Sequence, residues 1–291
     1  MIDVTDTELP LLPARDPFGH KGDYGRGLVV GGSLGMAGAP ALSAMACLAS
    51  GAGLVAVATP RCVLSTVAGY CPAYTTHPLA DDGEQLVAEA RTALDQLLSE
   101  ADAAAMGPGI GRGDAINDLL ERAWTESLPA VIDADGLNAL AARRSFLGTP
   151  GGPRVLTPHA KEFARLRGQP LDNPNHDAQR LEAAAELARS LGGPETVVLL
   201  KGARTVVTNG HRYAVNSTGN PGMATGGVGD VLTGVILALL CQGMAAFDAA
   251  RLAAHVHGLA GDLAAAKLGQ LSVTAPALIE ALPAAWRTVS S

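Results

Sequence analysis

Short apolar segments alternate with longer stretches of helix-forming composition, and this alternation is the strongest constraint on the fold. The expected strands are Gly27–Val30, Leu54–Ala58, Ala103–Met106, Ala130–Ile132, Arg154–Leu156, Val197–Leu200 and Thr205–Val207. The expected helices are Pro40–Gly51, Gly83–Glu100, Ala115–Glu126, Asp177–Leu191, Val231–Leu240, Asp248–Leu268 and Ala275–Trp286. Such alternation predicts a mostly parallel sheet covered by helices on both faces. In sheets of this kind, ligands bind beyond the carboxyl ends of the strands.

Composition narrows the class of protein. The chain has 291 residues, 48% of them apolar, which is enough for a sizeable core. A formal net charge of -7 and the lack of a Lys/Arg run argue against nucleic-acid binding. The sequence shows neither a basic and apolar leader nor an apolar stretch of about 20 residues, so we expect a cytoplasmic protein without a membrane span.

The chain is expected to form one domain over residues 1–291, with about the first 15 residues as an extended arm. A Pro/Gly patch at Gly148–Pro153 is interpreted as a surface loop, because a strand-like run follows it at once. The four cysteines include no C-x-x-C pair, and three of them lie in apolar or Ala-rich surroundings. They are therefore expected to be buried free thiols.

Two glycine-rich turns follow strand-like segments. Gly31–Gly35 matches the G-x-S-x-G motif of α/β-hydrolases, and His255 or His257 could complete a triad with Ser33. Only 32 residues precede Ser33, too few for the strands that such an enzyme places ahead of its nucleophile, so a turn that lets a ligand approach the backbone is favoured. Gly107–Gly111 does not have G-x-G-x-x-G spacing and is either a ligand platform or a structural turn.

The most informative segment is Asn220–Asp230, a glycine-rich loop that runs directly into an apolar helix. Unpaired backbone N–H groups at such a helix start, together with the helix dipole, form an anion hole suited to phosphate. Asp230 at the helix start can act as an N-cap. It can also accept a proton from a hydroxyl group that attacks the phosphate. The two roles are compatible.

Charged residues follow two other strands. Lys201 begins Lys201–Thr205 at a strand end, where it can reach a nucleotide phosphate or, alternatively, be a solvent-facing charge on a hairpin. Asp133 and Asp135 follow Ala130–Ile132. These carboxylates can hold waters around Mg²⁺ or cap the next helix, and the sequence favours neither.

Histidines occur at two further places. Thr157-Pro158-His159, with Glu162 three residues on, begins a helix; helix capping partly explains the pairing of Thr157 with Glu162, but capping does not require His159. His255 and His257 are two positions apart on a helix, so they cannot form an i, i+4 metal-binding pair. Packing or local hydrogen bonding is the expected role of these two.

Together these segments resemble the ADP/ATP-dependent NAD(P)H-hydrate dehydratase family of the ribokinase-like superfamily. The matching stretches run in order along the chain. They are HKGDYGRGLVVGG (20–32), GAPALSAMACLASGAGLV (38–55), MGPGIGR (106–112), DADGLNAL (133–140), LTPHAKEFARL (156–166), LLKGARTVV (199–207), NPGMATGGVGDVLTGVILALL (220–240) and HGLAGD (257–262).

The resemblance implies a three-layer α/β/α fold and the repair of hydrated NADH or NADPH in its S form. Asp230 would remove the proton from the hydroxyl on the hydrated ring. That oxygen would attack the terminal phosphate of ADP, as in bacterial members, or of ATP, and the phosphate would then leave. Gly227 and Gly229 would supply the anion hole.

The resemblance also assigns residues to ligands. Nucleotide binding falls to Lys201, Gly202, Ala203, Arg204, Thr205 and Gly229. The hydrated cofactor would lie along Ala39, Gly109, His159 and Asp230. Mg²⁺ is the implied metal; its ligands are unassigned, with Asp133 and Glu162 as candidates. Lys161 departs from the family, which usually has a glycine before the glutamate of this motif.

The implied partners are a separate NAD(P)H-hydrate epimerase and further copies of the chain, with a homotetramer favoured. The alternative function is a ribokinase-like small-molecule kinase that acts on a vitamin-precursor alcohol. It would also need an anion hole and an aspartate base, so the fold alone does not separate the two.

Overall fold

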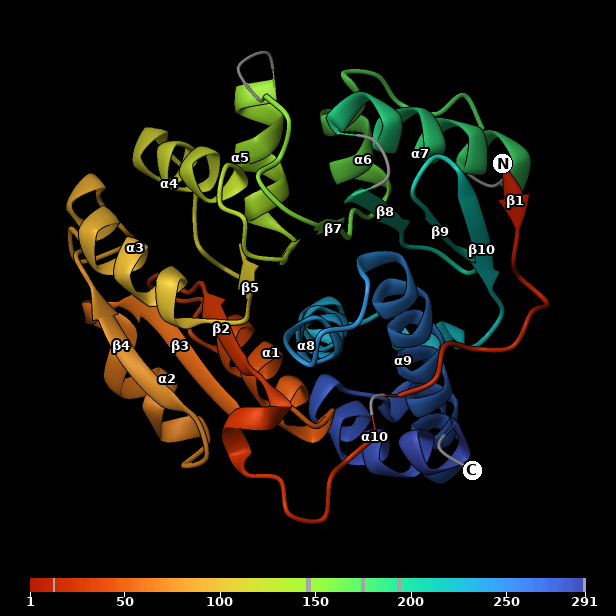
Figure 1. The fold of residues 1–291 in the computed structure, drawn as a ribbon, viewed down its shortest axis with the longest axis horizontal. Coiled ribbons are helices and arrows are strands. Elements are labelled where there is room, and N and C mark those ends of the chain that lie inside the picture. Colours follow the sequence, from red (N-terminus) through yellow and green to blue (C-terminus); the bar gives the residue numbers. More distant parts are fainter. Residues whose placement is uncertain (13, 145–147, 174–175, 193–194, 290–291) are drawn as a thin grey trace.

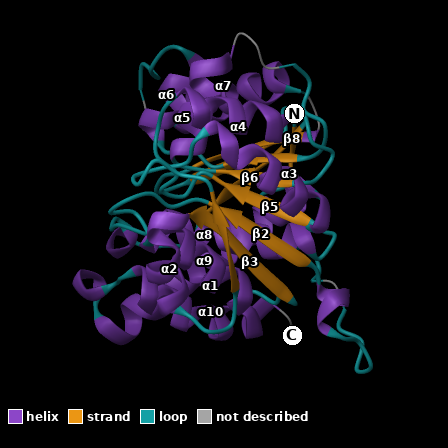
Figure 2. Ribbon diagram, turned by 90° about the vertical axis from the view of Figure 1, so that its left-hand side faces the viewer, coloured by secondary structure: helices purple, strands orange, loops and turns teal. Residues whose placement is uncertain are grey.

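One sheet with helices on both faces organises the described chain, which comprises residues 1–12, 14–144, 148–173, 176–192 and 195–289 of a computed structural model (Figures 1 and 2). Its strands are β1 (Ile2–Asp3), β2 (Arg26–Val30), β3 (Leu54–Pro60), β4 (Thr75–Leu79), β5 (Ala103–Met106), β6 (Ala130–Ile132), β7 (Arg154–Leu156), β8 (Thr196–Leu200), β9 (Thr205–Thr208) and β10 (Arg212–Asn216). They lie in the order β1-β10-β9-β8-β7-β6-β5-β2-β3-β4. The strands from β8 through β4 pair in parallel, whereas β9 is antiparallel to both neighbours.

Helices form the two outer layers. They are α1 (Gly38–Ala49), α2 (Leu64–Tyr70), α3 (Arg91–Glu100), α4 (Asp114–Trp124), α5 (Asp135–Arg143), α6 (Ala160–Arg167), α7 (Asp177–Leu191), α8 (Val228–Cys241), α9 (Ala246–Leu268) and α10 (Ala275–Val289). Helices α1, α2 and α8–α10 cover one face, and α3–α7 cover the other (Figure 2). The predicted three-layer α/β/α ribokinase-like architecture with a mostly parallel sheet is confirmed.

Strand side chains divide between two cores. On β2, Leu28 and Val30 pack with the α3–α7 layer, whereas Val29 between them packs with the opposite layer. This division follows from the alternation of side chains along a strand. It also explains why the central strands are almost continuously apolar, because both of their faces are covered.

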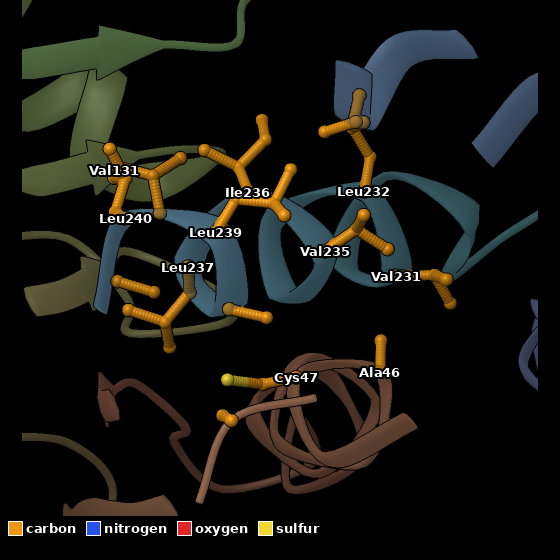
Figure 3. Packing of buried hydrophobic residues seen from close by; sticks show 14 of the residues in the cluster. Ala46, Cys47, Val131, Val231, Leu232, Val235, Ile236, Leu237, Leu239 and Leu240 are labelled. Atoms are coloured by element: carbon orange, nitrogen blue, oxygen red, sulfur yellow. The ribbon is translucent and has the colours of Figure 1, made fainter. Parts of the chain in front are cut away.

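Helix α8 occupies the middle of one core. Its residues from Val231 to Cys241 are buried on every side, which is the pattern of a helix enclosed by protein. Figure 3 shows α8 between Val131 of the sheet and Ala46 and Cys47 of α1. A Cβ atom at Gly234 would lie 2.1 Å from the Ser43 carbonyl oxygen, so the close approach of α1 requires glycine there.

The sequence-based helix Gly83–Glu100 is wrong in its first part. There, Asp82 accepts hydrogen bonds from the backbone amides of Glu84 and Gln85, each at 2.9 Å, and Gly83 has a φ of 97°. These local bonds stabilise a turn instead of a helix. A short 3₁₀ turn over Ala88–Ala90 then leads into α3.

Strands β1, β4 and β10 and helix α2 were not predicted from the sequence. The thiols are free, as expected, but only Cys47 and Cys241 are buried; Cys71 is partly buried and Cys62 is exposed. No helix in the described part of the chain combines the length and apolar character needed to cross a membrane.

Candidate active site

A cavity of about 980 Å³ lies at the carboxyl ends of the central strands. Its walls come from the segments that follow β6, β7, β8 and β10, together with the loop before α8 and part of α9. The glycine-rich segment Asn220–Asp230 forms one continuous side of it. This position agrees with the general rule for ligand sites in parallel sheets.

A second cavity of about 290 Å³ adjoins the first. Ala134, His159, Glu162 and Asp230 line both cavities. Asp230 therefore lies in the wall that the two cavities share.

Asp230 is the third residue of α8 and not its N-cap. The N-cap is Gly227, whose left-handed φ of 85° suits glycine. A Cβ atom at Gly227 would lie 2.6 Å from Leu42, and one at Gly229 would lie 3.3 Å from Lys201 Nζ. The sequence-based interpretation of Asp230 as the N-cap is wrong, because the N-cap lies three residues earlier, at Gly227.

The surroundings of Asp230 make it a base near neutral pH. Burial raises the pKa of its carboxyl to about 7, and the negative charge of Asp133 adds to this rise while Lys201 opposes it. Ser43 Oγ donates to the Asp230 carbonyl at 2.9 Å, which ties this turn of α8 to α1. A fixed carboxylate that titrates close to neutral pH is suited to accept a proton from a bound hydroxyl group.

Lys201 and Asp133 form a buried pair beneath Gly229. Lys201 Nζ donates to Asp133 Oδ1 at 2.9 Å, and Thr233 Oγ1 donates to Asp133 Oδ2 at the same distance. Burial lowers the pKa of Lys201, but the charges of Asp133 and Glu162 outweigh this and raise it overall. Lys201 is thus a charged group in the cavity wall and not the solvent-facing edge charge of the alternative interpretation.

His159 and Glu162 cap α6 together. His159 Nδ1 accepts the backbone N–H of Lys161 at 3.1 Å, and Glu162 Oε2 accepts the backbone N–H of His159 at 2.9 Å. The capping box therefore starts at His159 and not at Thr157. Because Nδ1 accepts, the ring proton lies on Nε2, which faces Glu162 Oε1 at 3.3 Å. Lys161 fits this helix start without disturbing the cap.

The acidic groups do not form a metal centre by themselves. Across the described ranges, no three His, Cys, Asp or Glu side chains converge on one point. Both oxygens of Asp133 already accept hydrogen bonds, and Glu162 is engaged with His159. A Mg²⁺ ion held by protein side chains alone therefore does not fit these residues.

The two cavities separate the residues that the sequence suggested for two ligands. Lys201, Gly202, Ala203, Thr205 and Gly229 line the large cavity, and Ala39 and Gly109 line the small one. Arg204 lines neither cavity, because its exposed side chain pairs with Asp177 at 2.7 Å.

Several lining residues were missed by sequence reasoning. In the large cavity, Asn216 ends β10 and Thr218 follows it, and β10 was not recognised as a strand. Because β10 has the same direction as the central strands, its carboxyl end meets the same edge of the sheet. Recognising β10 as a strand would have predicted that these residues lie at the edge of the sheet where the cavity is. Arg112, Asn138 and Arg165 in the small cavity carried no comparable signal.

The candidate hydrolase residues have other roles. Ser33 is buried and its hydroxyl donates to the Gly109 carbonyl at 2.9 Å. Burial lowers the pKa of His257 to about 4, and its Nε2–H donates to the Val228 carbonyl at 2.9 Å. The expected packing role of His257 is confirmed, and it braces the first turn of α8.

Comparison with known proteins places this site in a family. The family model described as NAD(P)H-hydrate dehydratase matches residues 27–284. The bifunctional NAD(P)H-hydrate repair enzyme Nnr of Moorella thermoacetica is 46% identical over 284 residues, which cover 96% of this chain and 52% of that protein. The chain spans about half the length of the curated relatives it matches.

Solved structures indicate the same family. The ADP/ATP-dependent NAD(P)H-hydrate dehydratase from Bacillus subtilis, crystallised with ATP/Mg²⁺, is 33% identical with a TM-score of 0.81, covering 96% of this chain and 95% of that one. A hydroxyethylthiazole kinase from Pyrococcus horikoshii has 15% identity and a TM-score of 0.60 over 92% of each chain, a likeness of fold alone. The family match spans Asp230 and the segments around both cavities. The chain therefore belongs to the NAD(P)H-hydrate dehydratase family.

Proposed function

We propose that the chain dehydrates the S form of hydrated NADH or NADPH back to NAD(P)H while ADP is converted to AMP and phosphate. The observation that carries this proposal is the position of Asp230, which lines both cavities. A reaction between a bound hydroxyl group and a bound phosphate needs a base at the point where the two meet.

The large cavity suits the nucleotide. At its end, the first turn of α8 offers the backbone N–H groups of Gly227 and Gly229, and the helix dipole favours negative charge there. Lys201 adds a positive charge at the same wall. Mg²⁺ would bind together with the nucleotide, coordinated by its phosphates.

The small cavity suits the hydrated ring. Ala39 and Gly109 give it a close backbone wall, because a Cβ atom at Gly109 would lie 2.9 Å from Met36. His159 closes the side shared with the large cavity. A ring held here would present its hydroxyl group to Asp230.

The chemistry then needs one base and one anion hole. Asp230 accepts the hydroxyl proton, and the oxygen attacks the terminal phosphorus of ADP, releasing AMP. The phosphate ester leaves with the electrons of its carbon–oxygen bond, and loss of a proton from the adjacent ring carbon restores the double bond. The amides at the start of α8 stabilise the charge that develops on the transferred phosphate.

The test is recovery of the near-ultraviolet absorbance of reduced nicotinamide after the protein is mixed with Mg²⁺ and prepared hydrated NADH. Parallel reactions contain ADP, ATP or no nucleotide. We expect a rise that depends on nucleotide and is faster with ADP. The variant Asp230→Asn should bind ADP without turnover. A flat trace with a folded protein that binds ADP would favour the vitamin-precursor kinase instead.

Finer features belong to the same proposal. We propose that residues 1–291 act as one domain, that the enzyme works in the cytoplasm, and that copies of the chain assemble as a homotetramer. An NAD(P)H-hydrate epimerase would supply the S form. Light scattering tests the assembly, and a mixed R and S substrate, converted completely only after epimerase is added, tests the partner.

A further inference from the structure

Arg180 is a buried cation that lies behind the wall of the large cavity. Only 6% of this residue is exposed, and it does not line either cavity. Its guanidinium donates to the carbonyl of Arg204 at 2.7 Å, of Leu200 at 3.2 Å and of Lys201 at 3.5 Å. Leu200 ends β8, and the other two acceptors belong to the turn between β8 and β9, which carries cavity-lining residues.

Gly202 is pressed against this guanidinium. A Cβ atom at Gly202 would lie 2.6 Å from Arg180 Nη2 and 3.2 Å from its Cζ. The turn therefore packs directly against Arg180. The φ of Gly202 is one that other residues can adopt, so this contact is what favours glycine here.

Asp177 completes the arrangement. It lies at the start of α7 and pairs with Arg180 Nη1 at 3.6 Å and with Arg204 Nε at 2.7 Å. The first contact partly balances the buried charge, and the second holds the Arg204 side chain outside the cavity. Helix α7 thus fixes both the backbone of the turn and its one arginine.

The hydrogen bonds of Arg180 also orient the amides of the turn. In a trans peptide the N–H points opposite to the C=O, so holding the carbonyls of Lys201 and Arg204 sets the direction of the amides of Gly202 and Thr205. Charge-assisted bonds of this kind are stronger than neutral ones. A turn held before the ligand arrives loses less conformational freedom when the ligand binds.

We propose that Arg180 is a positioning residue for nucleotide binding, holding the turn at residues 201–205 in its ligand-ready shape without touching the ligand. The inference rests on the proposed function only for the identity of the ligand. It predicts that a change at Arg180 alters the affinity for nucleotide but not the affinity for the hydrated cofactor, because residues 201–205 do not line the small cavity.

The test is the dissociation constant for ADP with Mg²⁺, measured by calorimetry without hydrated substrate, for Arg180→Met and Arg180→Lys. We expect Arg180→Met to weaken ADP binding about tenfold, because the turn must then be ordered when ADP binds, and to raise the KM for ADP in parallel. Arg180→Lys should recover part of the affinity, since one ammonium group reaches fewer carbonyls. The KM for hydrated NADH should stay within about twofold.

Arg189→Met is the matched control. Arg189 lies on the same helix, donates to the Gly210 carbonyl at 2.9 Å, and packs so that a Cβ atom at Gly210 would lie 2.5 Å from its Cγ. The turn at Gly210 lines neither cavity, so this variant should retain ADP affinity. Gly202→Ala tests the same contact from the other side and should also weaken ADP binding.

Unchanged ADP affinity in both Arg180→Met and Gly202→Ala would overturn the inference, as would equal weakening in Arg189→Met. Should Arg180→Met not fold, Arg180→Lys and Gly202→Ala decide alone. Failure of the proposed function is distinct: a wild-type chain that binds ADP but does not convert the hydrate refutes the function and leaves the role of Arg180 in ADP binding intact.

Discussion

Lys201 Nζ donates to Asp133 Oδ1 at 2.9 Å although the two residues are 68 positions apart in the chain. The pair joins the ends of β6 and β8, and Thr233 attaches α8 to the same carboxylate. Three elements that carry the candidate site are thereby locked together by one buried carboxylate, 2% exposed.

Replacing Asp133 by Asn should move the acidic limb of the kcat profile to lower pH. The negative charge of Asp133 raises the pKa of Asp230, and its removal also leaves Lys201 to lower that pKa. A rate profile measured on both sides of pH 7 checks the shift. Thr233→Val, which keeps the Asp133 charge, serves as the control. An acidic limb at the same pH in Asp133→Asn and in the wild type would show that Asp133 does not raise the pKa of Asp230.

Asp230→Asn should stabilise the folded protein above neutral pH. The folded carboxyl has a pKa of about 7 against an ordinary value of 3.8, so the folded state binds more protons between these values and stability falls as pH rises through that window. At pH 8 the variant should gain up to about 4 kcal/mol, and the difference should vanish below about pH 4. Urea denaturation at both pH values measures it. Equal midpoints at pH 8 would contradict the raised pKa.

Ala134→Gly should raise stability. Ala134 lines both cavities with a φ of 52° and a ψ of -122°, a conformation that L-residues with a side chain rarely adopt. Relief of this strain should exceed the entropic cost of glycine, leaving a gain of about 1 kcal/mol. In contrast, Ala141→Gly inside α5 should lose about 1 kcal/mol. Thermal unfolding compares the two, and a loss in both would mean that Ala134 is not strained.

Arg154→Met should destabilise the chain by about 3–5 kcal/mol while leaving the affinity for ADP unchanged at low temperature. The fully buried guanidinium donates to the carbonyls of Ala123, Trp124 and Leu128 near the end of α4, at 3.0, 2.7 and 2.8 Å. Methionine would leave these acceptors unpaired in the core. Chemical denaturation gives the loss, and Arg26→Met at an exposed position is the control. A change below about 1 kcal/mol would refute this role.

The central strands and the glycine-rich helix start could be predicted because their signals are local. Ala103–Met106 and Ala130–Ile132 are strands with the predicted bounds, since a doubly covered parallel strand is continuously apolar. Strand β4 was missed because it reads TTHPL, with a proline that is typical of an edge. Strand β10 was missed because its apolar run is short and has a polar residue at each end, Arg212 and Asn216.

The chemistry of the site was predictable only in part. The position of Asp230 at the start of α8 followed from a motif, but its raised pKa depends on burial and on the charge of Asp133, which the tertiary fold brings close to it. The Asp133–Lys201 pair likewise joins distant segments, so no spacing rule could reveal it. His159 was thought unnecessary for capping, because histidine is not among the residues favoured at that position.

The burial of α8 sets a limit on how this protein can move. Amide protons of Val231–Cys241, which the protein encloses on all sides, should be among the slowest in the chain to exchange with solvent. Asp230, the third residue of that helix, is anchored at the end of this enclosed segment. Ligand entry must therefore use the loops around the helix, and the geometry of the base persists for as long as the fold does.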